Sequence, residues 1–147
     1  MTDVEMPTPR GAMPAYLATP AGEGPWPGVV VIHDALGMST DVRNQADWLA
    51  SEGYLAVAPN LYYWGRRIRC LISTVRGGER PLSELDAARR WLAEHERCTG
   101  RTGVIGFCMG GDFALLMAPR AGVSVASVNY GGATREVERA LPGVCPI

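Results

Sequence analysis

The chain has 147 residues, of which 47% are hydrophobic and 20% are charged, and its formal net charge is −1 at pH 7. This composition is typical of one globular domain with enough apolar content for a core, so we treat residues 1–147 as a single domain. The near-neutral charge and the lack of a dense basic stripe argue against a nucleic-acid partner, because such proteins neutralise phosphates with clustered Lys and Arg.

The sequence also argues against a membrane partner and against export. No window approaches the roughly 18 apolar residues that a membrane-spanning helix requires. The first residues, "MTDVEMPTPRG", lack the charged and then apolar pattern of a signal peptide. The four cysteines, at positions 70, 98, 108 and 145, are irregularly spaced, with no C-x-x-C pair of the kind that a zinc site uses. We therefore expect free thiols, no metal and a cytoplasmic location.

The first predicted elements are a strand, a helix and a second strand. The short β-branched run "VVVIH" (29–33) follows a loop rich in Gly and Pro, as a buried strand does. Ser39 or Thr40 is expected to cap a helix that ends at Gly53, and "YLAVAP" (54–59) is the next buried strand. This order favours a parallel sheet.

The second half of the chain repeats this order after an ambiguous stretch from residue 60 to residue 80. A weak capping box at Ser83 and Asp86 marks the start of a helix with apolar residues at helical spacing. The predicted elements are then a helix in 81–96, a strand in 102–107, a helix in 109–118 and a strand in 123–132. We therefore expect an α/β domain with a mostly parallel sheet flanked by helices and a ligand site at the carboxyl ends of its strands.

A nucleophile elbow is predicted where Gly106-Phe107-Cys108-Met109-Gly110 joins a strand to a helix. Such a turn lifts one side chain above the sheet in strained backbone geometry, and small neighbours prevent a collision. Cys108 is thus a candidate nucleophile at the amino end of a helix, which favours the thiolate. The amides of Met109 and of Ala35, after the first parallel strand, are candidate donors to an oxyanion. The alternative is a structural cysteine buried in a tight junction.

Four segments, in this order and spacing, resemble the dienelactone hydrolase family, cysteine-dependent members of the α/β-hydrolase superfamily. They are "MPAYLATP" (13–20), "VVVIHDALG" (29–37), "YLAVAPNLY" (54–62) and "GFCMGG" (106–111), and the resemblance covers nearly the whole chain. It implies an α/β-hydrolase fold and hydrolysis of a carboxylic ester or lactone, a small-molecule substrate, without a cofactor. It also implies a thioester acyl-enzyme on Cys108, with the amides of Met109 and Ala35 as the oxyanion hole.

The sequence departs from the family's pattern at Asp34. Family members commonly have a glutamate at this position, close to the cysteine, where it influences the protonation of the thiol. Asp34 is one methylene shorter, and the resemblance makes it a candidate for the same catalytic role. The alternative is a loop carboxylate that caps nearby amides.

A larger departure follows the elbow. The family places a catalytic acid and then a histidine after the nucleophile, whereas no histidine follows Cys108 here. His33 is expected to be a packed imidazole and His95 a surface residue, and neither is expected to act as the base. We therefore expect the chain to be the amino-terminal portion of a hydrolase, with a sheet that is incomplete at its C-terminal side and with impaired activity on its own.

The stretch "NLYYWGRRIR" (60–69) follows a strand at the expected active face, where the family builds part of its substrate pocket. Tyr62 and Trp64 are candidates for the wall of an apolar cleft, and Arg66 for binding a substrate carboxylate. The alternative is a solvated basic loop with aromatic residues packed beneath it. A second class of function also stays open, a non-catalytic α/β domain that associates with itself or with a complementary chain.

Overall fold

The computed structural model describes residues 1–65, 79–132 and 144–147 of the chain. The sequence predictions from residue 29 onward are confirmed in type and order, although β3 and β5 begin a few residues earlier than predicted. In chain order the elements are β1 (Thr2–Thr8), β2 (Gly11–Ala18), β3 (Trp26–Ile32), α1 (Thr40–Ser51), β4 (Leu55–Pro59), α3 (Glu79–Ala93), β5 (Cys98–Phe107), α4 (Met109–Met117) and β6 (Val123–Asn129).

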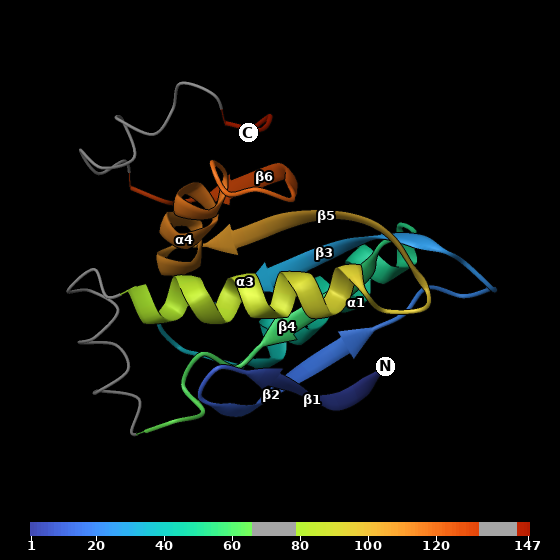
Figure 1. Cartoon of the computed structure of the whole chain (residues 1–147), viewed down its shortest axis with the longest axis horizontal. Helices are drawn as coiled ribbons and strands as arrows, with labels where there is room; N and C mark the ends of the chain where they lie inside the picture. The colour runs from blue at the N-terminus through green and yellow to red at the C-terminus, as the bar shows by residue number, and fades with distance from the viewer. Residues whose placement is uncertain (66–78, 133–143) are drawn as a thin grey trace.

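Six strands form one mixed sheet in the order β1-β2-β4-β3-β5-β6. The strands β4, β3, β5 and β6 are parallel neighbours, while β1 and β2 join them as an antiparallel hairpin along β4. Figure 1 shows α3 in front of this sheet and α1 behind it. The predicted architecture, a mostly parallel sheet flanked by helices, is therefore confirmed.

The two faces of the sheet carry separate apolar cores. Along β3, Val30 and Ile32 pack on the side of α3 and α4, whereas Val31 packs on the side of α1. This alternation follows from the two-residue period of a strand. On the α1 side, Ala46 is fully buried, and Ser39 caps the helix by accepting a hydrogen bond from the Val42 amide at 3.4 Å.

The predicted capping box at the start of α3 is wrong. The helix begins one turn earlier, at Glu79, and Ser83 lies within it, where its hydroxyl donates to the Arg80 carbonyl at 2.8 Å. The Asp86 carboxylate does not turn back toward the helix start but accepts hydrogen bonds from Arg89 and Arg90. A serine inside a helix commonly bonds a carbonyl of the preceding turn in this way.

The strand β1 was not predicted from the sequence. It pairs with β2 through a turn that ends at Gly11, whose φ of +127° suits glycine, and Met6 and Met13 are fully buried partners across this pair. Pro7 interrupts the β-branched pattern that identifies a strand, and an edge strand is the place where a sheet tolerates proline. In the parts of the chain that the structure describes, no helix combines the length and the apolar composition needed to cross a membrane.

Candidate active site

The turn between β5 and α4 holds Cys108 in an unusual backbone conformation. Its φ is +52° and its ψ is −116°, a region that residues with a side chain rarely adopt. A Cβ atom on Gly106 would lie 1.9 Å from the Gly110 carbonyl oxygen, and one on Gly110 would lie 2.3 Å from the Ile32 carbonyl oxygen. Because both contacts are with backbone, neither position accepts a larger residue without a backbone shift. The structure thus has the strand-turn-helix geometry that the G-x-C-x-G spacing predicts.

The Cys108 backbone is fixed while its side chain reaches solvent. Its amide donates to the Asn129 carbonyl at the end of β6 at 2.8 Å, and its carbonyl accepts from the amides of Gly111 at 2.8 Å and Asp112 at 3.2 Å. Cys108 is an exposed free cysteine, so it is not the buried structural thiol of the alternative interpretation. The fixed backbone and the open side chain together suit a nucleophile.

The two candidate oxyanion donors lie at the same edge of the sheet. Ile32, at the end of β3, pairs with Gly106 near the end of the parallel strand β5, so the loop with Ala35 and the start of α4 leave the sheet side by side. No hydrogen bond from the Ala35 or Met109 amide is present among the described residues. The Tyr62 hydroxyl lies 3.2 Å from the Ala35 carbonyl oxygen and 3.7 Å from Met109 Sδ. One side chain therefore reaches both segments.

The Asp34 carboxylate closes its own loop. Its Oδ1 accepts a hydrogen bond from the Leu36 amide at 2.8 Å, and its carbonyl oxygen accepts one from the Gly37 amide at 3.2 Å. This is the capping role that the sequence left open as an alternative. Its other expected role, an influence on the thiol of Cys108, stays a prediction.

His33 is a packed imidazole, as the sequence predicts. It is fully buried, and its Nε2 accepts a hydrogen bond from the Leu61 amide at 3.1 Å. This assignment makes Nδ1 the protonated nitrogen, which donates to the Asp34 carbonyl oxygen at 2.7 Å. His95 is half-buried rather than a surface residue, and its Nδ1 accepts from the Arg97 amide at 3.2 Å. The fold therefore uses both imidazoles as acceptors for backbone amides.

The three predicted substrate contacts have different outcomes. Tyr62 is 7% exposed and packs its ring edge against His33 with the centroids 4.8 Å apart. Trp64 is half-buried, and the Arg80 guanidinium lies over its ring at 3.8 Å. Arg66 lies outside the described residues. Their roles in substrate binding stay predictions.

A buried carboxylate, Glu84 on α3, was missed by the sequence reasoning. It is 1% exposed, and its Oε1 accepts from Arg80 Nε at 3.0 Å and from the Tyr63 hydroxyl at 3.2 Å. A signal for it exists, because Glu84 precedes Ala88 by four residues and so lies on the apolar face of the helix. This cluster ties α3 to the segment that follows β4.

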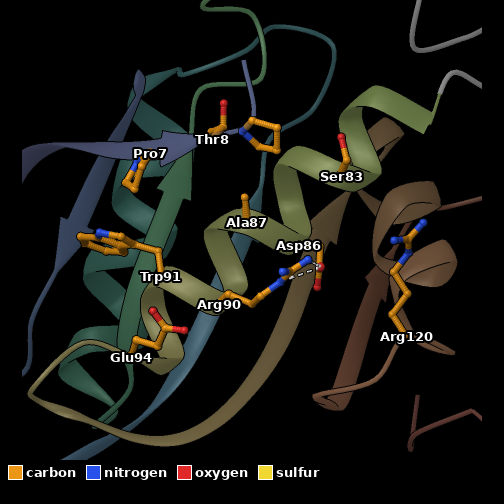
Figure 2. Close-up of a pocket in the computed structure, with 10 residues that line it drawn as sticks. Pro7, Thr8, Ser83, Asp86, Ala87, Arg90, Trp91, Glu94 and Arg120 are labelled. Carbon is orange, nitrogen blue, oxygen red and sulfur yellow. Dashed lines mark hydrogen bonds and ion pairs between the residues drawn. The ribbon is translucent and has the colours of Figure 1, made fainter. Parts of the chain in front are cut away.

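One pocket of the described residues lies away from the elbow. Its volume is about 460 Å³, and Figure 2 shows it between the end of β1, the outer face of α3 and Arg120.

Asp86 is one of the residues that line this pocket. Burial raises the pKa of Asp86, but hydrogen bonds from Arg90 and Arg89 outweigh the effect of burial and hold the pKa below its usual 3.8. Within the described ranges there is no group of three or more metal-ligating side chains.

Comparison with known proteins tests the family resemblance. The family model described as "Dienelactone hydrolase family" matches residues 13–147. The chain belongs to the dienelactone hydrolase family. A solved structure from Klebsiella pneumoniae, provisionally assigned as a dienelactone hydrolase, superposes with a TM-score of 0.81 at 30% identity and covers 90% of this chain.

Two curated relatives extend this comparison. A carboxymethylenebutenolidase of Pseudomonas putida is 27% identical over 88% of the chain. A protein of Azospirillum brasilense, provisionally named carboxymethylenebutenolidase, is 32% identical over 90% of the chain. The chain spans 60% and 62% of the length of these two relatives, and 60% of the Klebsiella pneumoniae chain. The predicted α/β-hydrolase fold, incomplete relative to these proteins, is therefore confirmed.

Proposed function

We propose that this chain carries the nucleophile of a cysteine-dependent hydrolase that cleaves carboxylic esters or lactones through a thioester acyl-enzyme. The observation that supports it most strongly is the exposed side chain of Cys108, held at positive φ at the first turn of α4. Its neighbours at this edge of the sheet are the amides of Met109 and Ala35, the proposed oxyanion hole.

The proposed reaction begins with the Cys108 thiolate. Its sulfur attacks the carbonyl carbon of the ester, an S–C bond forms, and the carbonyl oxygen takes the negative charge while the Met109 and Ala35 amides donate to it. The oxyanion then collapses, the bond from carbon to the ester oxygen breaks, and the alcohol leaves with a proton from solvent. Water hydrolyses the thioester, releases the carboxylic acid and restores the thiol.

The family resemblance assigns the activation of water to an acid and a histidine that follow the nucleophile in sequence. The printed sequence has no histidine after Cys108. We therefore assign this role to a segment outside residues 1–147, and we assign Asp34 an influence on the protonation of the thiol. The chain by itself is then expected to form the acyl-enzyme readily and to hydrolyse it slowly.

The proposed substrate is a small ester or lactone with a carboxylate. Tyr62 and Trp64 would flank its apolar part, and Arg66 would bind the carboxylate, because a guanidinium matches a carboxylate with two parallel hydrogen bonds. The proposed location is the cytoplasm, since the described cysteines at positions 98, 108 and 145 are all free.

A second candidate is a non-catalytic domain that associates with itself or with a complementary chain. It is supported by an apolar groove of about 370 Å³ over β3, β5 and β6, lined in part by Tyr54, Gly103 and Val125. Val125 in this groove is 48% exposed, and exposed apolar surface favours association. This candidate requires no reactivity of Cys108, which separates it from the first.

The experiment is a stopped-flow measurement of nitrophenolate release from p-nitrophenyl acetate at neutral pH. The wild-type chain is expected to release about one equivalent in a rapid burst and then to slow, because acylation is faster than deacylation. Cys108→Ala is expected to abolish the burst, and Cys98→Ala, which changes a half-buried thiol at the other end of β5, is expected to retain it. A burst that survives in C108A, or no burst in wild type, would refute the proposal and favour the second candidate.

A further inference from the structure

Tyr62 links the two segments that carry the proposed oxyanion donors. Its hydroxyl donates to the Ala35 carbonyl oxygen at 3.2 Å and lies 3.7 Å from Met109 Sδ. These contacts span 27 and 47 residues of the sequence. Among the side chains that the structure describes, no other hydroxyl reaches both of these residues.

Tyr62 is itself held firmly at this position. The preceding residue, Leu61, donates its amide to His33 Nε2 at 3.1 Å, and the Tyr62 amide donates to Asn60 Oδ1 at 3.0 Å. Its ring packs edge-on against His33, and it is 7% exposed. A hydroxyl on a buried and fixed ring loses little conformational freedom when it makes a hydrogen bond.

The position of the loop after β3 relative to α4 depends on the hydrogen bonds that the loop makes. Within the loop, the Leu36 and Gly37 amides and His33 Nδ1 bond to Asp34, and His33 Nε2 ties the loop to the Leu61 amide. Among the described residues, none of these bonds reaches α4. Leu36 is 63% exposed, so solvent rather than protein lies on the outer side. The Tyr62 hydroxyl thus adds a contact between this loop and Met109, the first residue of α4.

We infer that Tyr62 is a positioning residue: its hydroxyl holds the Ala35 carbonyl next to Met109 so that both main-chain amides point at the same substrate oxygen. This inference rests on the proposed function, because it assumes that these two amides form the oxyanion hole. Misplacing a donor by a fraction of an ångström weakens the stabilisation of an oxyanion far more than it weakens the fold.

The test compares two reactions of the same sulfur in the full 147-residue chain. Acylation by p-nitrophenyl acetate passes through a tetrahedral oxyanion, whereas alkylation of Cys108 by iodoacetamide is a displacement at a saturated carbon and forms no oxyanion. Tyr62→Phe is expected to slow acylation by about fivefold to tenfold, the effect of one net hydrogen bond. Alkylation of Cys108, followed by peptide mapping between pH 6 and pH 10, is expected to keep its rate and its pH profile within about twofold.

Tyr16→Phe is the matched control. Tyr16 is 8% exposed, and its hydroxyl donates to Asp47 Oδ1 at 2.8 Å on the α1 side of the sheet, so its loss removes a similar bond away from Cys108. The ratio of acylation to alkylation is expected to be unchanged in Y16F. An equal ratio of acylation to alkylation in Y62F and wild type would overturn the inference. This holds whether both rates are unchanged or both fall by the same factor.

Failure of the inference and failure of the proposed function give different results. If wild type and C108A acylate at the same rate, the proposed function fails; if wild type acylates through Cys108 and Y62F does so equally well, only the inference fails. Should Y62F not fold, Met109→Leu decides the question, because it removes the sulfur contact and keeps the side-chain volume. Its ratio is expected to fall about threefold, beyond the margin allowed for alkylation, and a ratio equal to that of wild type would overturn the inference.

Discussion

At the scale of single residues, the backbone of Cys108 explains why its sulfur is available. Cys108 is exposed at a φ of +52°, and the bonds of its backbone to Asn129, Gly111 and Asp112 fix this conformation. The strain of a residue with a Cβ in such a region lowers the free energy of unfolding by about 1–3 kcal/mol, which interactions elsewhere in the fold must offset. Gly106 and Gly110 leave the space that the turn needs.

This strain predicts an order of stability for two variants that both lack the thiol. Cys108→Gly is expected to have a larger free energy of unfolding than Cys108→Ala by about 1 kcal/mol, because glycine relieves the strain while giving back part of the gain as unfolded-chain entropy. Urea unfolding followed by circular dichroism measures the difference. If C108A is as stable as C108G or more stable, the backbone at this position is not strained.

The candidate site was partly predictable at this scale. The spacing of Gly106, Cys108 and Gly110 identifies the elbow because only one local geometry requires it. The capping by Asp34 was left open, and the contacts of the Tyr62 hydroxyl were not predicted. They depend on which loops meet at the sheet edge, and a local pattern carries no information on contacts between residues 27 or 47 positions apart.

At the scale of elements, long and regular patterns gave the correct strands and helices. The apolar spacing of α1 and the β-branched run of β3 each specify one buried face, and tertiary packing then agrees with local preference. The start of α3 was misplaced because Ser83 and Asp86 have the side chains of a capping box but bond within the helix. The edge strand β1 was missed because Pro7 weakens its pattern.

The helix α3 also carries a prediction of pH dependence. The pKa of Asp86 is lowered because hydrogen bonds from Arg90 and Arg89 outweigh the effect of burial, so the ionised carboxylate stabilises the folded state. Asp86→Asn is expected to reduce the free energy of unfolding at pH 7 by roughly 1 kcal/mol, a typical value for such pairs. This difference is fully present above the usual pKa of 3.8 and is lost as the pH falls through the lowered pKa.

Urea unfolding of D86N and wild type between pH 7 and pH 2.5 checks this prediction. Glu96→Gln is the matched control, because it removes an exposed carboxylate just beyond the same helix, and it is expected to leave stability within about 0.5 kcal/mol at every pH. A deficit of D86N that persists unchanged at the lowest pH would show that the ion pairs do not stabilise the fold.

At the scale of the whole molecule, the proposed catalytic groups lie at the carboxyl ends of the parallel strands. The parallel strands β3 and β5 end beside each other, so the loop with Ala35 after β3 and the turn with Cys108 after β5 leave the sheet side by side. The chain spans 60% and 62% of two curated relatives, and our account assigns the activation of water to what lies outside it. The proposed function thus assigns only acylation to residues 1–147.

The central claim is that Cys108 is an acylable nucleophile, and peptide mapping of the chain after brief exposure to p-nitrophenyl acetate tests it most directly. We predict one acetyl group per chain, on Cys108 and labile to hydroxylamine as a thioester is, with Cys145 unmodified because burial raises the pKa of its thiol. Acetyl groups spread over other residues, or an unmodified Cys108 beside a modified Cys98 or Cys145, would contradict the account.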